Sequence, residues 1–528
     1  MFMKRNHLLA TMKLCLLAIA SSALFFTSCA QDGFDDETWS SDVKNSQLQS
    51  PQPNDITISP TADKSKTIIS WKAVGGARAY KVTVNNVTEQ VPVIVVDSII
   101  DGVSFTIPRP EDSNFTMSIL TLANTGLGNK DAETATVVNF TSFVQSLGTI
   151  TSGTDLSIYF DKGKKISAEG VDLPEEFCYD LEPGGTYTIS DTLDFAPISE
   201  DGTISYPVTL RCTDKNNRPT ITITSTTITN PEDGTESTRY GRISTTVPLT
   251  LQNLKFDYSI IPDDQAAKTA AIFLSDKTNL PVVGSTFKYV IKGGAVQCKN
   301  CDFSGLKGMF LFDNNKLEYC IETFILDNCR IQFQTPGDNI SSKAFFYLQK
   351  GFVKDFFIRN STLWNTGTAN IQYVISYHNS GRIDRAGYDK TIDTESVNIL
   401  NSTLYNIGYG NFANYPGFAG QNYTCFDIQN NIFVDAGKGG SGVARRLLGG
   451  RNASSYSKKC VFSQNTYWTN GAAEKEGAPL SVEGATETYD TSHSALQSDP
   501  LLTNPAKGDL TPTGSEQVEK KTGDPYWF

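Results

Sequence analysis

Apolar and polar positions alternate along residues 53–143, and this alternation predicts short β-strands. It is clearest at residues 67–71, 79–84, 103–107 and 115–120, with turn-forming residues between them. A period of two places one face of a strand on a core and the other in water. Short strands at this spacing are typical of a two-sheet β-sandwich.

A second pattern, a repeated hexapeptide, runs from residue 251 to residue 467. Seven segments share the form apolar-x-Asn-x-x-apolar, and their third positions are Asn253, Asn300, Asn328, Asn360, Asn401, Asn430 and, with glutamine instead, Gln464. These positions are 47, 28, 32, 41, 29 and 34 residues apart. An irregular period near 30, with strand-like sequence between the repeats, predicts a solenoid whose loops vary in length.

A parallel β-helix explains why this repeat needs asparagine. Each coil lays a strand on the equivalent strand of the next coil, so equivalent residues stack about 4.8 Å apart. Asparagine tolerates the left-handed conformation at a bend, and its amide can bond the next asparagine in the stack. A leucine-rich-repeat horseshoe is the alternative, but it requires a shorter period and leucine consensus lines that are absent.

The N-terminus predicts export and lipidation. Lys4 and Arg5 precede an apolar run over residues 14–26, which is too short to span a bilayer comfortably. The run ends in Phe26-Thr-Ser-Cys29, which resembles a bacterial lipobox, so we expect Cys29 to become a lipidated N-terminus. An ordinary signal peptide with a chance cysteine is the alternative. The polar residues 30–52 predict a flexible tether.

Two further resemblances divide the chain into domains. Trp71, Tyr80 and the stretch Ala123-Asn124-x-Gly126-x-Gly128 make residues 53–143 similar to a fibronectin type III domain. Residues 144–528 resemble pectin-lyase-like right-handed parallel β-helix proteins. The whole arrangement, with acidic residues after Cys29, looks like uncharacterised surface lipoproteins of Bacteroidetes polysaccharide-utilisation systems. The resemblance implies an all-β chain on the outer membrane, exposed at the cell surface, beside glycan-import proteins.

Composition excludes several classes of function. The formal net charge is −12, and removing the first 28 residues, with three basic residues and no acid, makes it −15. So acidic a chain is a poor general partner for nucleic acid. Its three histidines include His7 in the leader, which excludes a tri-histidine zinc site. We expect the eight cysteines after Cys29 to be mostly buried thiols in the core.

Ligand-binding residues are expected in the loops between repeats. The gap between Asn360 and Asn401 carries Arg382, Arg385 and Lys390, and the next loop has six aromatic residues within 405–423, including Tyr409 and Tyr415. Exposed aromatic rings stack on sugar faces. The alternative is that these rings bury the loop against the coil.

A basic segment follows. Residues 436–460 contain six basic residues and no acid, among them Arg445, Arg446 and Arg451. Arginine binds carboxylates in bidentate geometry, as uronic acids would present them. A solvated loop, or one paired with acids elsewhere, is the alternative. Together with the aromatic loop, the segment predicts a binding surface for an acidic, pectin-like polysaccharide.

Three functions remain open. We favour a cell-surface glycan-binding lipoprotein without a cofactor, with no catalytic residue assigned. The alternative is a calcium-dependent polysaccharide lyase acting on uronic-acid glycans by β-elimination, with Arg382, Arg385 or Lys390 as the base. In it, Asp384, Asp389 and Asp393 would hold Ca²⁺. The third is a structural surface protein without sugar specificity.

Overall fold

In a computed structural model the chain forms two compact units, Met1–Gln145 and Ser146–Phe528. The structure describes residues 43–61, 66–89, 91–110, 112–160, 177–195, 206–274, 289–313, 319–337, 344–349, 351–368, 371–377, 395–414, 424–439, 461–473, 490 and 492–528. The predicted leader, with Cys29, lies outside these residues. Within them, no helix is long and apolar enough to cross a membrane.

The first unit is built from two antiparallel sheets. One sheet has the order β1 (Ile56–Pro60), β2 (Lys66–Trp71), β5 (Ser104–Pro108), and the other has the order β4 (Val93–Ile100), β3 (Ala77–Asn86), β6 (Asn114–Ala123), β7 (Thr136–Thr141). The 3₁₀ turn η1 (Pro53–Asp55) precedes β1, and the 3₁₀ turn η2 (Thr125–Leu127) lies between β6 and β7. The likeness of this unit to a fibronectin type III domain stays a prediction.

The core of this unit follows the alternation seen in the sequence. On β6 every second residue from Phe115 to Ala123 is buried, and on β3 Tyr80, Val82 and Val84 are buried. Trp71 meets Tyr80 edge-on with 5.1 Å between ring centroids, and the Tyr80 hydroxyl accepts a hydrogen bond from the backbone N–H of Val74. The buried faces therefore point toward one shared core.

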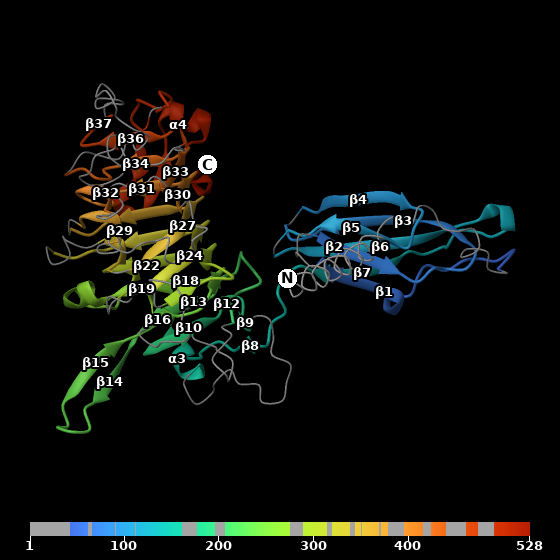
Figure 1. Cartoon of the computed structure of the whole chain (residues 1–528), viewed down its shortest axis with the longest axis horizontal. Coiled ribbons are helices and arrows are strands. Elements are labelled where there is room, and N and C mark those ends of the chain that lie inside the picture. Colours follow the sequence, from blue (N-terminus) through green and yellow to red (C-terminus); the bar gives the residue numbers. More distant parts are fainter. Residues whose placement is uncertain are drawn as a thin grey trace, which may run out of the picture. The chain divides into compact units, whose positions relative to one another are not determined.

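The second unit is a coil whose described strands form three long walls, stacked upward from the green to the red strands in Figure 1. Wall 1 contains β8 (Thr149–Ile150), β9 (Phe177–Leu181), β12 (Val208–Arg211), β17 (Leu249–Gln252), β21 (Val296–Lys299), β24 (Tyr319–Asp327), β27 (Phe352–Arg359), β30 (Glu395–Leu400), β33 (Thr424–Gln429) and β35 (Val461–Ser463), with β20 (Tyr289–Ile291) beside β24. Wall 2 contains β10 (Thr186–Ile189), β13 (Thr220–Ile223), β18 (Lys255–Asp257), β22 (Asp302–Leu306), β25 (Arg330–Phe333), β28 (Thr362–Asn365), β31 (Thr403–Tyr405), β34 (Ile432–Val434), β36 (Thr466–Thr469) and β37 (Ala472–Ala473). Wall 3 contains β11 (Thr192–Phe195), β16 (Arg242–Thr245), β19 (Ala270–Leu274), β23 (Met309–Phe312), β26 (Ala344–Leu348), β29 (Tyr373–Tyr377) and β32 (Asn411–Asn414).

Smaller elements decorate the coil. They are the helices α3 (Leu156–Tyr159) and α4 (Ser515–Lys520), the 3₁₀ turns η3 (Asp263–Lys268), η7 (Pro505–Lys507) and η8 (Pro525–Trp527), and the hairpins β14 (Ser225–Thr229) with β15 (Glu236–Tyr240) and β38 (Leu502–Asn504) with β39 (Asp509–Pro512). The hairpins and the β36–β37 pair are antiparallel, whereas the other wall strands pair in parallel. The all-β prediction is confirmed, and the long parallel walls are those expected of a β-helix.

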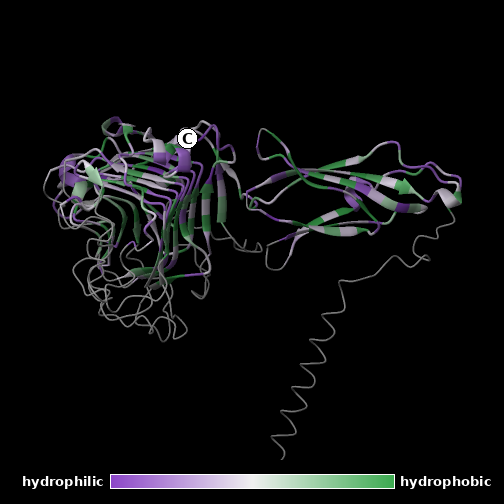
Figure 2. Cartoon of the chain, turned by 90° about the horizontal axis from the view of Figure 1, so that it is seen from above, coloured by the Kyte–Doolittle hydropathy of each residue, from purple (hydrophilic) through white to green (hydrophobic). Residues whose placement is uncertain are grey.

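The walls enclose one apolar core. In wall 2 the inward position is filled coil after coil by Phe256, Phe303, Ile331, Leu363, Leu404, Phe433 and Tyr467, all at most 3% exposed. Where neighbouring coils carry the same residue at this position, the side chains stack, as Phe256 and Phe303 do with 4.7 Å between ring centroids. Figure 2 shows hydrophobic and hydrophilic residues alternating along the strands.

The repeated asparagine sits at the bend from wall 1 to wall 2. All six asparagines and Gln464 have a positive φ, between 49° and 58°. The amide of Asn300 donates to Asn253, Asn328 to Asn300, Asn401 to Asn360 and Asn430 to Asn401, with distances of 2.8 to 3.4 Å. Asn360 instead donates to the carboxylate of Asp327. The predicted left-handed asparagine ladder is confirmed.

The residue after each ladder asparagine forms a second, buried column. The backbone N–H of Cys329 donates to the hydroxyl of Ser361, that of Ser361 to Ser402, that of Ser402 to the amide oxygen of Asn431, and that of Asn431 to Asn465. The bend would otherwise leave these N–H groups unpaired in the core, so small polar side chains are required here.

Candidate functional site

The outer face of wall 2 carries two rows of side chains. The first row consists of Lys255, Asp302, Arg330, Thr362, Thr403, Ile432 and Thr466, which face one another in register. The second row lies two residues further along each strand, and it includes Asp257, Ser304 and Gln332 and ends in Trp364, Tyr405, Val434 and Trp468. Both rows point away from the core, because side chains two residues apart share a face.

The chain's C-terminal segment covers the upper part of the first row. We call residues 515–528 the strap. The side-chain amide of Gln517 donates to the hydroxyl of Thr466 (3.1 Å), the N–H of Asp524 donates to that of Thr403 (3.1 Å), and the indole N–H of Trp527 donates to that of Thr362 (2.7 Å). The strap therefore pairs threonine hydroxyls on three coils, and those threonines are at most 1% exposed.

Asp524 is the buried acid of the strap. Its carboxylate accepts from the hydroxyl of Thr362 (2.7 Å) and from the N–H of Tyr526 (3.0 Å), and the residue is 1% exposed. Burial raises the pKa of Asp524 to about 6, and its hydrogen bonds and the Arg330 guanidinium oppose this only in part. A carboxyl group that titrates near neutral pH thus fastens the strap to the coil.

Beside the strap lies a row of three aromatic side chains and one valine. Trp364, Tyr405, Val434 and Trp468, which we call the aromatic row, occupy the same register position on β28, β31, β34 and β36. All four are half-buried, and they span three strand spacings, about 14 Å. The Trp364 ring also packs near Gly508: a Cβ atom at residue 508 would lie 3.4 Å from the ring.

Polar groups cluster where the aromatic row turns toward wall 3. The ammonium of Lys438 donates to the side-chain oxygen of Asn406 (2.7 Å) and lies 4.0 Å from the carboxylate of Asp435. The N–H of Asn470 donates to Asp435 (2.9 Å), and its amide donates to the backbone oxygen of Lys438 (3.2 Å). Burial, together with the charge of Asp435, raises the pKa of Tyr405. We call Asn406, Asp435, Lys438 and Asn470 the polar corner.

Tyr409 stands next to this corner with 38% of its surface exposed. Its backbone N–H donates to the backbone oxygen of Ile371, and its own backbone oxygen accepts from the N–H of Gly439. A side chain at Gly439 would lie only 2.1 Å from the Tyr409 ring. The ring is therefore packed against a glycine that admits no larger residue without movement.

The structure places only part of the predicted binding surface. Tyr409 is exposed as predicted, and Tyr405 is half-buried, but Phe412 belongs to the core and does not face solvent. The basic segment contributes Lys438. The other predicted residues lie outside the described residues: Arg382, Asp384, Arg385, Asp389, Lys390, Asp393, Tyr415, Arg445, Arg446 and Arg451.

Sequence reasoning missed Trp364, Trp468 and the contacts that the strap makes. A signal for the two tryptophans was present, because each stands four residues after a ladder position, as do Tyr405 and Val434. Strand alternation makes that position outward-facing. The partners of the strap could not be read from the sequence, since they lie about 50 to 165 residues away.

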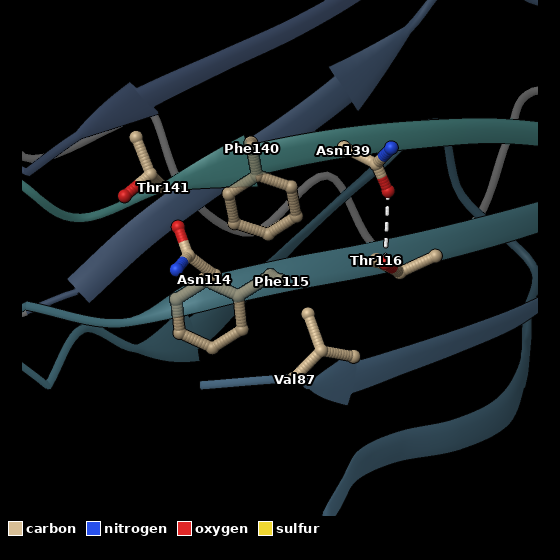
Figure 3. A pocket seen from close by; sticks show the side chains of 7 residues that line it. All are labelled: Val87, Asn114, Phe115, Thr116, Asn139, Phe140 and Thr141. Atoms are coloured by element: carbon tan, nitrogen blue, oxygen red, sulfur yellow. Dashed lines mark hydrogen bonds between the residues drawn. The ribbon is translucent and has the colours of Figure 1, made fainter. Parts of the chain in front are cut away.

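The described residues contain no group of three or more His, Cys, Asp or Glu side chains that could hold a metal ion. A shallow, open pocket of about 440 Å³ lies in the first unit, lined by Val87, Asn114, Phe115, Thr116, Asn139, Phe140 and Thr141. Figure 3 shows the Phe115 and Phe140 rings there, which stack with 4.9 Å between centroids. None of its lining side chains is an acid or a base, so the pocket offers contact surface without acid–base chemistry.

Comparisons with known proteins describe domains but no activity. Residues 3–184 match a family described as a domain of unknown function, DUF4992, and residues 185–366 match another domain of unknown function, DUF4957. Their boundary falls in the turn between β9 and β10, inside the second unit. The search of curated protein sequences found no match.

One solved structure found is a pectate lyase from Erwinia chrysanthemi in complex with tetragalacturonic acid. It is 9% identical to this chain, and the alignment covers 85% of this chain and 100% of that chain, with a TM-score of 0.16. A TM-score this low supports no argument about shared structure or function.

Proposed function

We propose that this protein is a surface lipoprotein, anchored through Cys29, that binds a polysaccharide on the outer face of wall 2. The observation that carries the proposal is the aromatic row, in which Trp364, Tyr405 and Trp468 face outward at one register position. A repeating surface of this kind suits a repeating ligand, because each coil presents its side chain at a constant spacing.

The side chains of the site have the chemistry that sugars require. Half-buried aromatic rings offer an apolar face to the C–H groups of a sugar ring, and the Tyr405 hydroxyl and the Trp468 indole N–H add polar groups, whereas the Trp364 indole N–H is buried. In the polar corner, Asn406 and Asn470 can donate and accept, Asp435 accepts and Lys438 donates, which matches hydroxyl groups that do both.

The preference for an acidic glycan rests on the basic segment. Lys438 is the member of that segment that the structure describes, and its side chain is 30% exposed beside the aromatic row. A partly exposed ammonium attracts the carboxylate of a uronic acid and adds a salt-dependent part to the affinity. The proposed ligand is therefore a pectin-like chain.

Affinity electrophoresis in gels containing polygalacturonate, and in gels containing a neutral galactan, tests the proposal. Trp468→Ala and Tyr405→Ala should weaken retention about tenfold, since ring stacking in nucleic-acid complexes contributes roughly 1–3 kcal/mol per ring. Trp468→Phe should retain most of the affinity. Lys438→Gln should weaken binding to polygalacturonate but not binding to the neutral galactan. The control Lys292→Gln replaces an exposed lysine on the wall 1 side and should change binding to neither glycan.

The control for the aromatic variants is Ile260→Ala, which removes an exposed apolar side chain from the same unit, 50% exposed, outside the aromatic row. Unchanged retention of Trp468→Ala and Tyr405→Ala would reject the row as the binding surface. If the protein released unsaturated product from polygalacturonate with Ca²⁺ added, the non-catalytic binding function would be rejected in favour of the polysaccharide lyase. If the protein were neither retained by any glycan nor active on any glycan, the remaining function would be that of a structural surface protein.

A further inference from the structure

Tyr526, in the strap, is an exposed aromatic ring held in a fixed position. The residue is 59% exposed, yet the guanidinium carbon of Arg330 lies 4.0 Å from the centre of its ring. Trp527 meets the same ring edge-on with 4.9 Å between centroids. One face of the ring is thus occupied by a cation, and much of the remaining surface is open to solvent.

The groups that hold the ring are themselves fixed. Arg330 is only 9% exposed, and its two terminal nitrogens donate to the backbone oxygen (2.6 Å) and the side-chain oxygen (2.7 Å) of Asn328. Trp527 donates to Thr362, and the N–H of Tyr526 donates to Asp524. A ring held by such contacts loses little conformational entropy when a ligand stacks on it.

The charges around Tyr526 narrow the class of ligand. Arg330 faces Asp302 in register, Asp302 faces Lys255, and Arg218 donates to the Asp302 carboxylate. The cations Lys255, Arg218 and Arg330 lie among the carboxylates of Asp302 and Asp524, so the charges of this cluster largely balance. Since the Arg330 guanidinium already occupies one face of the ring, a second cation stacked on Tyr526 is disfavoured.

Tyr526 and the aromatic row belong to the same side of wall 2. Arg330, beneath the Tyr526 ring, is two residues from Gln332, and Gln332 faces Trp364 in register. From β25, which carries Arg330, to β36, which carries Trp468, the wall advances by four strand spacings, about 19 Å. An extended chain lying along the aromatic row would therefore reach Tyr526 at its lower end.

We infer that Tyr526, backed by Arg330, is a further stacking position for a neutral or anionic sugar ring of the same polysaccharide. This inference rests on the proposed function, and it extends the site onto the C-terminal strap. It also gives the strap a part in binding beyond fastening the coils together. The alternative is that Tyr526 only closes the end of the strap.

Three substitutions of Tyr526 separate these possibilities. Tyr526→Phe keeps the ring and should bind within about twofold of the unsubstituted protein. Tyr526→Leu keeps apolar bulk over Arg330 without a ring, and Tyr526→Ala removes both, so each should bind long oligogalacturonides about tenfold more weakly. Short oligogalacturonides bound by the aromatic row should be affected little. Isothermal titration calorimetry measures the affinities, and circular dichroism melting verifies that each variant is folded.

The outcomes distinguish this inference from the proposed function. If Tyr405→Ala and Trp468→Ala weaken binding but folded Tyr526→Ala and Tyr526→Leu do not, the Tyr526 position is wrong and the aromatic row stands. Equal binding by the Leu and Phe variants would also overturn a stacking role. If Tyr526→Ala weakens binding while the variants of the aromatic row do not, the Tyr526 position stands and the aromatic row is rejected.

Discussion

The hydroxyl of Thr362 donates a 2.7 Å hydrogen bond to the carboxylate of Asp524, 162 residues further along the chain. Both residues are at most 1% exposed, and the same hydroxyl accepts from the indole N–H of Trp527. This contact joins the strap to the middle of the coil. The stability of the strap should therefore depend on the charge of Asp524.

The pH dependence of stability follows from the raised pKa of Asp524. Its pKa is about 6 in the folded protein against an ordinary value of 3.8, so the folded state binds the proton more tightly than the unfolded state. The stabilisation is fully present below pH 3.8 and is lost as the pH rises through about 6. It amounts to roughly 3 kcal/mol. Asp524→Asn should flatten the fall in melting temperature between pH 4 and pH 7.

The control for this prediction is Asp233→Asn, which changes an exposed carboxylate in the turn between β14 and β15. Between pH 4 and pH 7, this variant should show the same slope of melting temperature against pH as the unsubstituted protein. If Asp524→Asn and the unsubstituted protein melt with the same slope, Asp524 does not titrate in this range.

Asn401 tests the ladder. Its φ is +49°, its amide donates to Asn360, and its side-chain oxygen accepts from Asn430. Asn401→Ala should lower the free energy of unfolding by about 2–4 kcal/mol, because alanine is strained in the left-handed region and both hydrogen bonds are lost. Asn401→Gly removes the strain but not the loss of the bonds, so it should cost about half as much.

Denaturant unfolding followed by circular dichroism measures the stability of both variants. Their unfolding midpoints are compared, because a long coil can unfold in more than one step. The ranking of the two substitutions is the decisive result. A glycine variant as unstable as the alanine variant would show that backbone strain contributes nothing at this bend.

The cysteines near the ladder should be unreactive in the folded protein. Cys298, Cys301 and Cys329 are free and fully buried, and burial raises the pKa of each thiol, to about 12 for Cys329. The thiolate is the reactive form, so iodoacetamide at pH 8 should label these residues only after unfolding. Peptide mass spectrometry distinguishes them from the other cysteines. Rapid labelling of Cys329 in the native protein would show that its coil opens.

Part of the candidate site could be predicted from the sequence, because aromatic and basic residues cluster within short stretches of the chain. The sequence predicts Tyr409 because it lies in an aromatic loop, and it identifies the basic segment to which Lys438 belongs. Phe412 was grouped with the exposed aromatics, yet it is buried, because β32 turns this residue into the core. Composition cannot distinguish an inward from an outward position on a strand when the strand itself is not located.

The coil could be identified from the repeat in the chain alone. The spacing of Asn253, Asn300, Asn328, Asn360, Asn401 and Asn430 identified the bends, since an L-residue there must adopt the left-handed conformation and asparagine does so at low cost. These are local constraints, and a linear pattern carries them. The return of the strap to Thr466, Thr403 and Thr362, and the position of Tyr526 over Arg330, become visible only in the folded chain. Such contacts join residues of unrelated sequence position, because they depend on which buried hydroxyls and cations remain to be paired after the coil has stacked.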